Sequence, residues 1–125
     1  MTEIYAIIPP KDEKGPAFSE KGYFQIQAIS KILPKYSTVI SGDDRTQKSI
    51  LLALKITPDD HIGLLGKPIV EEDQALAFLD TFENNTLLIT SRTFLAALNF
   101  RDIGEKTMLV KIIVNDVWND IEEIA

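Results

Sequence analysis

Cysteine is absent from the 125-residue chain, and histidine occurs once, at His61. Without cysteine the chain can form no disulfide, thiolate nucleophile or usual structural zinc site. A single histidine also excludes any mechanism that needs two. No apolar run approaches the ~20 residues of a membrane span, and the start Met1-Thr2-Glu3 lacks the basic residues of a signal peptide. These absences predict a cytoplasmic protein with no membrane association.

Basic residues are outnumbered, 13 against 19 acidic ones, which gives a formal net charge of −6. A nucleic-acid partner would need a concentrated basic patch, so we expect no such partner. Hydrophobic residues make up 45% of the chain and charged ones 26%, a composition that can build a folded core. The length and the absence of a linker predict one domain over residues 1–125.

Short apolar segments alternate with segments of helical periodicity along the chain. We predict strands at Ile4–Ile8, Thr38–Ile40, Ile62–Leu65, Thr86–Thr90 and, as the last, Met108–Val114. We predict helices from Ser19 to Pro34, Arg45 to Lys55, Glu71 to Phe82 and Arg92 to Asn99, with a turn at 57–60. Residues 117–124 fit a helix or a strand. The alternation predicts an α/β fold, a three-layer α/β/α sandwich with a mainly parallel central sheet.

Several motifs, in this order, resemble those of the histidine phosphatase superfamily, whose fold is phosphoglycerate mutase-like. They are Ile4–Ile8 before Pro9-Pro10, Phe18-Ser19-Glu20-Lys21-Gly22 with Gln25, Val39-Ile40-Ser41 with Arg45 and Ser49, and Asn85–Leu98. The short chain is most similar to the small bacterial phosphohistidine phosphatases, which also lack a large cap insert. The resemblance implies the same sandwich fold over most of the chain.

The matched positions depart from the family where its chemistry takes place. The resemblance places Pro9 at the nucleophilic histidine, with Ile8 in place of the arginine and Pro10 in place of the glycine. Ser91 stands where the family has its second catalytic histidine. Proline has no lone-pair nitrogen to attack phosphorus, and a serine hydroxyl is a neutral donor. The resemblance therefore implies a degenerate member without catalytic residues.

Four residues are candidates for a remaining anion site: Ser41, Arg45, Ser91 and Arg92. Arg45 follows a strand and opens a helix, where a guanidinium and helix N–H groups favour a phosphate. It could equally pair with Asp43 or Asp44. Ser91 and Arg92 repeat this arrangement after another strand, although Ser91 could simply cap a helix while Arg92 points to solvent.

Two functions remain open at this point. One is a non-catalytic domain that binds a protein or a phosphate-like anion. The other is an enzyme acting on a phosphorylated metabolite through Arg45 and a relocated acid, Glu71 or Glu72, although acidic residues at a helix start also suit the helix dipole. A third reading, an α/β domain unrelated to the family, leaves the order of the motifs unexplained. We expect no cofactor or metal, because the Asp pairs at 43–44 and 59–60 lack a ligand spacing. The sequence leaves the oligomeric state open.

Overall fold

The computed structural model describes eight stretches of the chain, residues 2–9, 20–42, 45–57, 59–61, 71–100, 103–104, 106–115 and 119–125. Within them it does not describe the side chains of residues 20, 21, 45, 46, 60, 61 and 119. The elements are β1 (Thr2–Ile8), α1 (Glu20–Ile32), β2 (Thr38–Ser41), α2 (Arg45–Leu54), β3 (Asp60–His61), α3 (Glu72–Leu79), β4 (Thr86–Ile89), α4 (Arg92–Ala97), β5 (Met108–Val114) and β6 (Asn119–Glu123).

One six-stranded sheet forms the centre, in the order β3-β2-β4-β1-β5-β6. The first four strands in this order are mutually parallel. β5 runs antiparallel to β1 and β6 antiparallel to β5. The prediction of a mainly parallel central sheet is confirmed, and the strands predicted at Ile4–Ile8, Thr38–Ile40 and Thr86–Thr90 correspond to β1, β2 and β4.

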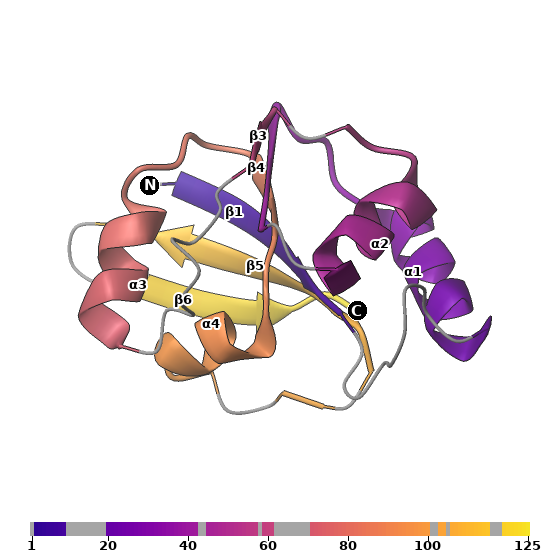
Figure 1. Ribbon diagram of the computed structural model, residues 1–125. Helices are drawn as coiled ribbons and strands as arrows, with labels where there is room; N and C mark the ends of the chain where they lie inside the picture. Colours follow the sequence, from indigo (N-terminus) through magenta and orange to yellow (C-terminus); the bar gives the residue numbers. More distant parts are fainter. Residues whose placement is uncertain are drawn as a thin grey trace.

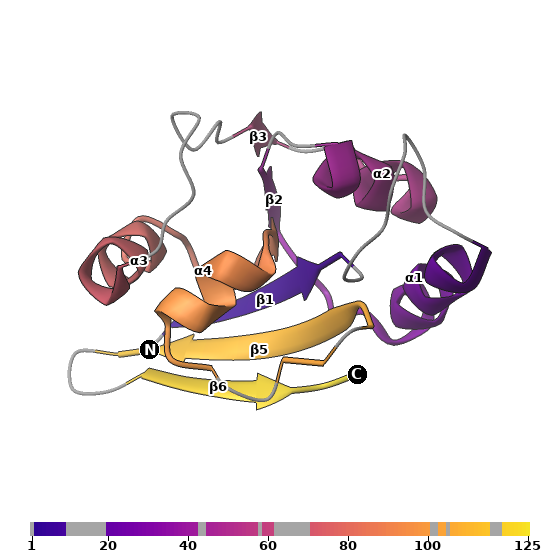
Figure 2. The ribbon, with the colours of Figure 1, turned by 60° about the horizontal axis from the view of Figure 1, so that its bottom comes forward.

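Helices cover both faces of this sheet (Figures 1 and 2). Successive side chains of a strand point to opposite faces, so β1 contributes to both cores: Tyr5 and Ile7 pack with α1 and α2, whereas Ile4, Ala6 and Ile8 pack with α3 and α4. The two clusters define the outer layers, and the predicted three-layer sandwich is confirmed.

The ends of the helices follow from local chemistry. α1 ends at Ile32, ahead of Pro34, which cannot continue a helix. α2 ends at Leu54 because Lys55 adopts a left-handed backbone with φ 57°, and α4 ends similarly before Asn99, with φ 64°. The helix predicted at 92–99 therefore ends at Ala97. The helix predicted at 71–82 also ends earlier than expected, at Leu79.

Two predictions about strands need correction, those for Asp60 and for the last strand. Asp60, predicted in a turn, pairs with Ile40 in the short strand β3, and the predicted strand at 62–65 lies outside the described residues. Met108–Val114 has the predicted bounds but is not the last strand. The open segment 117–124 contains a strand, β6, because its main chain pairs with β5 and Ile121 faces Ile112 on the α3–α4 side.

Candidate functional site

The carboxyl ends of β1, β2 and β4 meet at one edge of the sheet. Thr90 N donates to Ile7 O and Gly42 N donates to Ile89 O, each at 3.0 Å. These bonds bring residues 9, 41–42 and 90–91 together. The chain leaves β1 and β2 toward the α1–α2 layer but leaves β4 toward α4, on the other face. Parallel α/β sheets commonly bind ligands where their connections diverge in this way.

The end of β1 is tied to the chain segment just before β5. Ile8 is fully buried, and its carbonyl accepts a hydrogen bond from Thr107 Oγ1. On the other side Thr107 N donates to Gln25 Oε1 of α1, at 3.3 Å. Pro9 is half-buried, and Pro10 lies outside the described residues. At Ile8 and Pro9, where the sequence resemblance implies catalytic residues, the chain is thus part of the frame of the fold, the contacts that join β1, α1 and the segment before β5.

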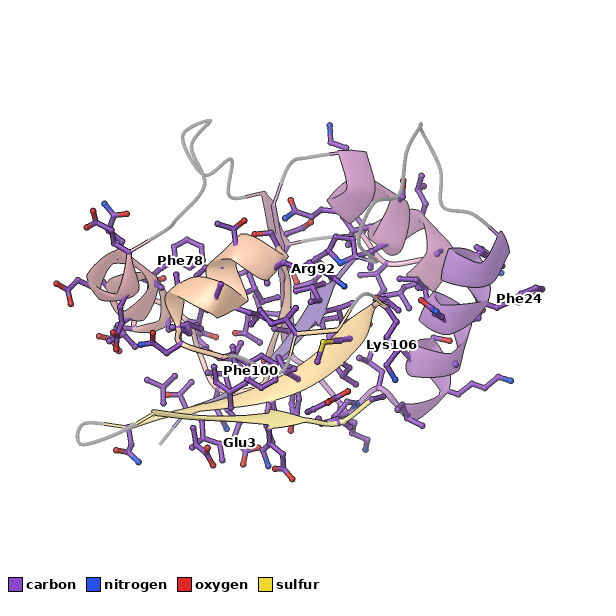
Figure 3. The ribbon with its side chains drawn as sticks, turned by 90° about the horizontal axis from the view of Figure 1, so that it is seen from below. Glu3, Phe24, Phe78, Arg92, Phe100 and Lys106 are labelled. Atoms are coloured by element: carbon purple, nitrogen blue, oxygen red, sulfur yellow. The ribbon has the colours of Figure 1, made fainter. Side chains whose placement is uncertain are left out.

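Arg92 completes this frame from the opposite layer. Its Nη1 donates to Pro9 O, and its Nη2 donates to Gly104 O at 2.7 Å and Lys106 O at 2.8 Å. Figure 3 shows Arg92 at the start of α4, on the side of the molecule where Lys106 leads into β5. The alternative in which Arg92 points to solvent is wrong, because its guanidinium binds three backbone carbonyls.

The two candidate serines also make local bonds. Ser91 Oγ accepts from Phe94 N at 3.3 Å and caps α4, which confirms the capping alternative. Ser41 is fully buried, and its hydroxyl donates to Gly42 O at 2.8 Å. The donor of Ser41 is therefore used within the chain, whereas Ser91 acts here as an acceptor.

Gln47 is a residue of this edge that the sequence reasoning missed. It lies on α2 with 3% of its surface exposed, and its side chain covers Gly42 so closely that a Cβ there would stand 2.0 Å from Gln47 Oε1. Only a residue without a side chain fits at position 42 with Gln47 in this place. Gly42 next to a helix start was visible in the sequence, but nothing in it identified Gln47 as its partner.

Arg45 begins α2 directly after this edge, so its backbone occupies the predicted position at a helix start. Its side chain lies outside the described residues, as do Asp43, Asp44 and the side chain of His61. Its predicted contacts with an anion or with the neighbouring carboxylates therefore remain predictions.

The acidic residue Glu72, at the start of α3, lies away from Ser91 and Arg92. Glu72 Oε2 accepts from Asn99 Nδ2 at 2.8 Å, and Asn99 follows the carboxyl end of α4. Ser91 and Arg92 are at the opposite end of that helix. Glu71, Glu72 and Asp73 are all exposed. The structure thus separates Glu72 from the strand ends to which a relocated acid would have to reach.

Shifted pKa values occur at a cluster on β1 and β5, on the α1–α2 face of the sheet. Lys111 Nζ lies 3.3 Å from Glu3 Oε1, and Tyr5 donates to Glu3 Oε2 at 3.2 Å. The hydrogen bond and charge of Glu3 raise the pKa of Lys111. Burial first, and then Glu3, raise the pKa of Tyr5. Both shifts favour the protonated forms, so neither group is prepared to act as a base or nucleophile.

Among the residues that the structure describes, no three Asp, Glu or His side chains are grouped so as to hold a metal ion. Within the same stretches, no helix combines the length and apolar composition needed to cross a bilayer.

The arrangement of helices and strands defines the class of fold. It is the α/β sandwich of the SixA-type phosphohistidine phosphatases, a phosphoglycerate mutase-like fold. No protein-family model matches the sequence, and no curated protein matches it.

Three solved structures illustrate the likeness. SixA of Agrobacterium tumefaciens, described as a phosphohistidine phosphatase, is 12% identical with a TM-score of 0.66, over 99% of this chain and 97% of that one. The protein histidine phosphatase SixA complexed with tungstate is 5% identical with a TM-score of 0.69, over 97% and 94%. A protein from Thermus thermophilus is 10% identical with a TM-score of 0.65, over 89% and 93%. At these identities the likeness concerns the fold alone.

Proposed function

We propose that this chain is a non-catalytic member of the histidine phosphatase superfamily that acts as a binding module. The observation that carries the proposal is the arrangement at Pro9. This residue stands at the position that the family resemblance assigns to the nucleophile, and its carbonyl is bound by Arg92. The second such position, Ser91, is occupied by a helix cap. Both positions serve the frame of the fold. Neither carries an imidazole, the group through which the resemblance implies phosphoryl transfer.

The enzymatic alternative has no comparable support. It requires Arg45 to work with Glu71 or Glu72, yet Glu72 bonds to Asn99 beyond the far end of α4. A general acid must come within hydrogen-bond reach of the leaving group. We therefore argue for the binding module alone.

An assay on an aryl phosphate and on a histidine-phosphorylated protein tests the absence of catalysis. Loss of a covalent nucleophile costs on the order of a million-fold in well-studied enzymes, so we expect a rate equal to that of a mock-purified control. The matched variant restores the family motif with Ile8→Arg, Pro9→His, Pro10→Gly and Ser91→His. Pro9→His keeps the carbonyl that Arg92 binds, and trace activity in this variant would show that the backbone retains the family's geometry. Turnover by the unmodified chain above the control would contradict the proposal.

A weak anion site is a subordinate part of the proposal. Ser41, Ser91 and Arg92 bind within the protein, so the site depends chiefly on Arg45. One charge-assisted contact with helix N–H groups corresponds to millimolar affinity or weaker, since ~4.1 kcal/mol matches a dissociation constant of 1 mM. Phosphate should raise the melting temperature slightly above a chloride control of equal ionic strength, and Arg45→Ala should abolish this difference. If the Arg45→Ala variant shows the same rise in melting temperature, the proposal of an anion site at Arg45 is contradicted.

A further inference from the structure

The acidic net charge of the chain conceals a strong asymmetry. Six of the 13 basic residues but only two of the 19 acidic ones lie between residues 21 and 57, which gives this segment a net charge of +4. It contains most of α1 and all of α2. Residues 71–83, around α3, contain five acidic residues and no basic one. The two helical layers therefore carry charges of opposite sign.

The outer side of the α1–α2 layer combines lysines with exposed apolar side chains. Gln27 Nε2 donates to Ala53 O at 2.7 Å and joins the two helices. Phe24 and Lys31 lie within about one turn of this bond on α1, as Leu52 and Lys55 do at the end of α2. Phe24 is 61% exposed and Leu52 79%. We call these four residues the basic face.

Large exposed apolar side chains beside charged ones are typical of interaction surfaces rather than of a solvated helix. Tyr23 extends the apolar part, because its ring contacts Phe24 edge to face with centroids 6.2 Å apart. Figure 3 shows Phe24 projecting from the outer side of α1, away from the sheet.

The outer side of α3 has the complementary character. Asp73, Ala77 and Asp80 recur at spacings of four and three residues, so they share one side of the helix, and all three are exposed. The buried residues of α3, Ala75 and Leu79, face the sheet. The small Ala77 lies between two carboxylates and leaves room for a larger apolar side chain of a partner. We call these three residues the acidic face.

The basic and acidic faces lie on opposite sides of the sheet, because α1 and α2 pack in one core cluster and α3 in the other (Figures 1 and 3). Two basic faces set against each other would bring lysines together, which electrostatics disfavours. We propose that the basic face of one copy docks on the acidic face of a second copy. Phe24 and Leu52 then cover Ala77, and Lys31 and Lys55 approach Asp73 and Asp80.

The position of the two faces determines the kind of assembly. Contacts between two different surfaces that lie on opposite sides of a molecule are heterologous and do not close on themselves after two copies. The assembly therefore grows as a short chain of copies rather than stopping at a symmetric dimer. Its contacts depend on exposed charges, so salt must weaken it.

Sedimentation velocity over a range of protein concentrations tests this proposal. We expect the weight-average sedimentation coefficient to rise with concentration at about 0.02 M ionic strength and to fall to the monomer value at about 0.5 M, where the Debye length is much shorter. A chain that stays monomeric at low salt, or that forms a dimer which does not grow, would overturn the proposal.

Two variants separate the faces. Phe24→Gln/Lys31→Gln/Lys55→Gln removes the basic face, and Asp73→Asn/Asp80→Asn removes the acidic face. Each should weaken association about tenfold or more, the size expected for losing two exposed ion pairs with their apolar neighbours. An equimolar mixture should form heterodimers and nothing larger, because each variant keeps one native face. Unchanged association of either variant, or no heterodimer in the mixture, would contradict the model of docking.

Net charge provides the matched control. Asp73→Asn/Asp80→Asn lowers the overall acidity, so general repulsion alone would make this variant associate more strongly, whereas specific docking makes it associate less. Glu122→Gln/Glu123→Gln on β6 changes the net charge equally and should associate like the unmodified chain. Binding of the basic face to phosphatidylglycerol vesicles or to a DNA duplex, without self-association, would assign it to a different partner and overturn the proposal.

Discussion

On the α3–α4 side of the sheet the phenylalanines lie inside the protein and acidic residues outside. Phe78 contacts Phe82 and Phe94 edge to face, with ring centroids 4.8 and 5.7 Å apart. On the α1–α2 side, the buried residues of the core cluster are aliphatic apart from Tyr5. The aromatic residues of α1, Tyr23 and Phe24, lie outside. The same residue type therefore has different roles on the two sides.

This difference distinguishes stability from recognition. A buried ring removes a large apolar area from water and gains edge-to-face contacts, so it stabilises the fold. A ring that is mostly exposed contributes little to folding and is available to a partner. We therefore expect substitutions of the buried rings on the α3–α4 side to act on unfolding, and substitutions of the exposed rings outside α1 to act on association.

Truncating one phenylalanine on each side gives the largest expected contrast. Phe94 is 1% exposed, so Phe94→Ala should lower the free energy of unfolding by about 3–5 kcal/mol. Phe24→Ala should change it by no more than about 0.5 kcal/mol, as exposed substitutions usually do. Urea unfolding followed by circular dichroism measures both. Comparable destabilisation by the two substitutions would show that Phe24 belongs to a core and would break the comparison.

A second contrast concerns the two layers at the end of β1. Arg92→Ala removes the donors to three carbonyls, one of them partly buried, and should cost about 2 kcal/mol of stability because water can reach the other two. Gln25→Ala, from the α1 side, removes one acceptor and should cost about 1 kcal/mol. Arg92→Lys should recover less than half of the loss, since a lysine cannot span several acceptors with a planar fork.

The same measurement decides between two roles of Arg92. If the side chain serves the frame of the fold, its removal lowers the unfolding midpoint in urea without any anion. A variant with unchanged stability but a smaller response to phosphate would instead assign Arg92 to anion binding. That result would contradict the role given by its three carbonyl contacts.

The helix cap at Ser91 gives a smaller effect. Ser91→Ala leaves Phe94 N without its side-chain acceptor and should lower stability by about 1 kcal/mol. Thr93→Ala, at an exposed position of the same helix, serves as the control and should have almost no effect. Equal losses in both variants would show that the bond from Phe94 N to Ser91 is not the cause, because alanine itself favours a helix over serine and threonine.

The sequence predicted most of the fold because its strongest signals are local. β1 contains the apolar run Ile4–Ile8, and β5 is apolar apart from Lys111 and has the predicted bounds. β6 could not be assigned, because it is an edge strand in which acidic residues surround a single inward apolar side chain, Ile121. Only the pairing with β5 makes this segment a strand.

The candidate site was predictable to a lesser extent for the same reason. The Ser91 cap is a local motif, and its alternative role was recognised in the sequence. The contacts of Arg92 were not, because its acceptors at residues 9, 104 and 106 are backbone carbonyls, which carry no sequence signature. Thr107 and Gln47 were missed because their roles depend on tertiary contacts that bring distant segments together.

The smallest expected effect concerns the cluster of Glu3, Tyr5 and Lys111 on the α1–α2 face of the sheet. Glu3 raises the pKa of Lys111 above its ordinary value of 10.5, and burial, followed by Glu3, raises the pKa of Tyr5 above its ordinary value of 10.0. A group with a raised pKa in the folded state adds stability below its unfolded pKa and loses this contribution as the pH rises through the folded pKa. The contribution is therefore present at neutral pH and decreases above about pH 10.

Glu3→Gln removes the carboxylate that favours both protonated forms. The variant should be slightly less stable than the unmodified chain at pH 7, and the difference should narrow above about pH 10, where the unmodified chain loses its advantage. Urea unfolding at pH 7 and pH 11 measures this, and tyrosinate absorbance, assigned with Tyr5→Phe, should show a lower pKa for Tyr5 in the variant. A difference that is constant between the two pH values would mean that Glu3 acts through packing alone. In that case the cluster would stabilise the fold through packing, as the uncharged contacts of the α3–α4 side do. The two faces of the sheet would then not differ in a stabilising role of charge.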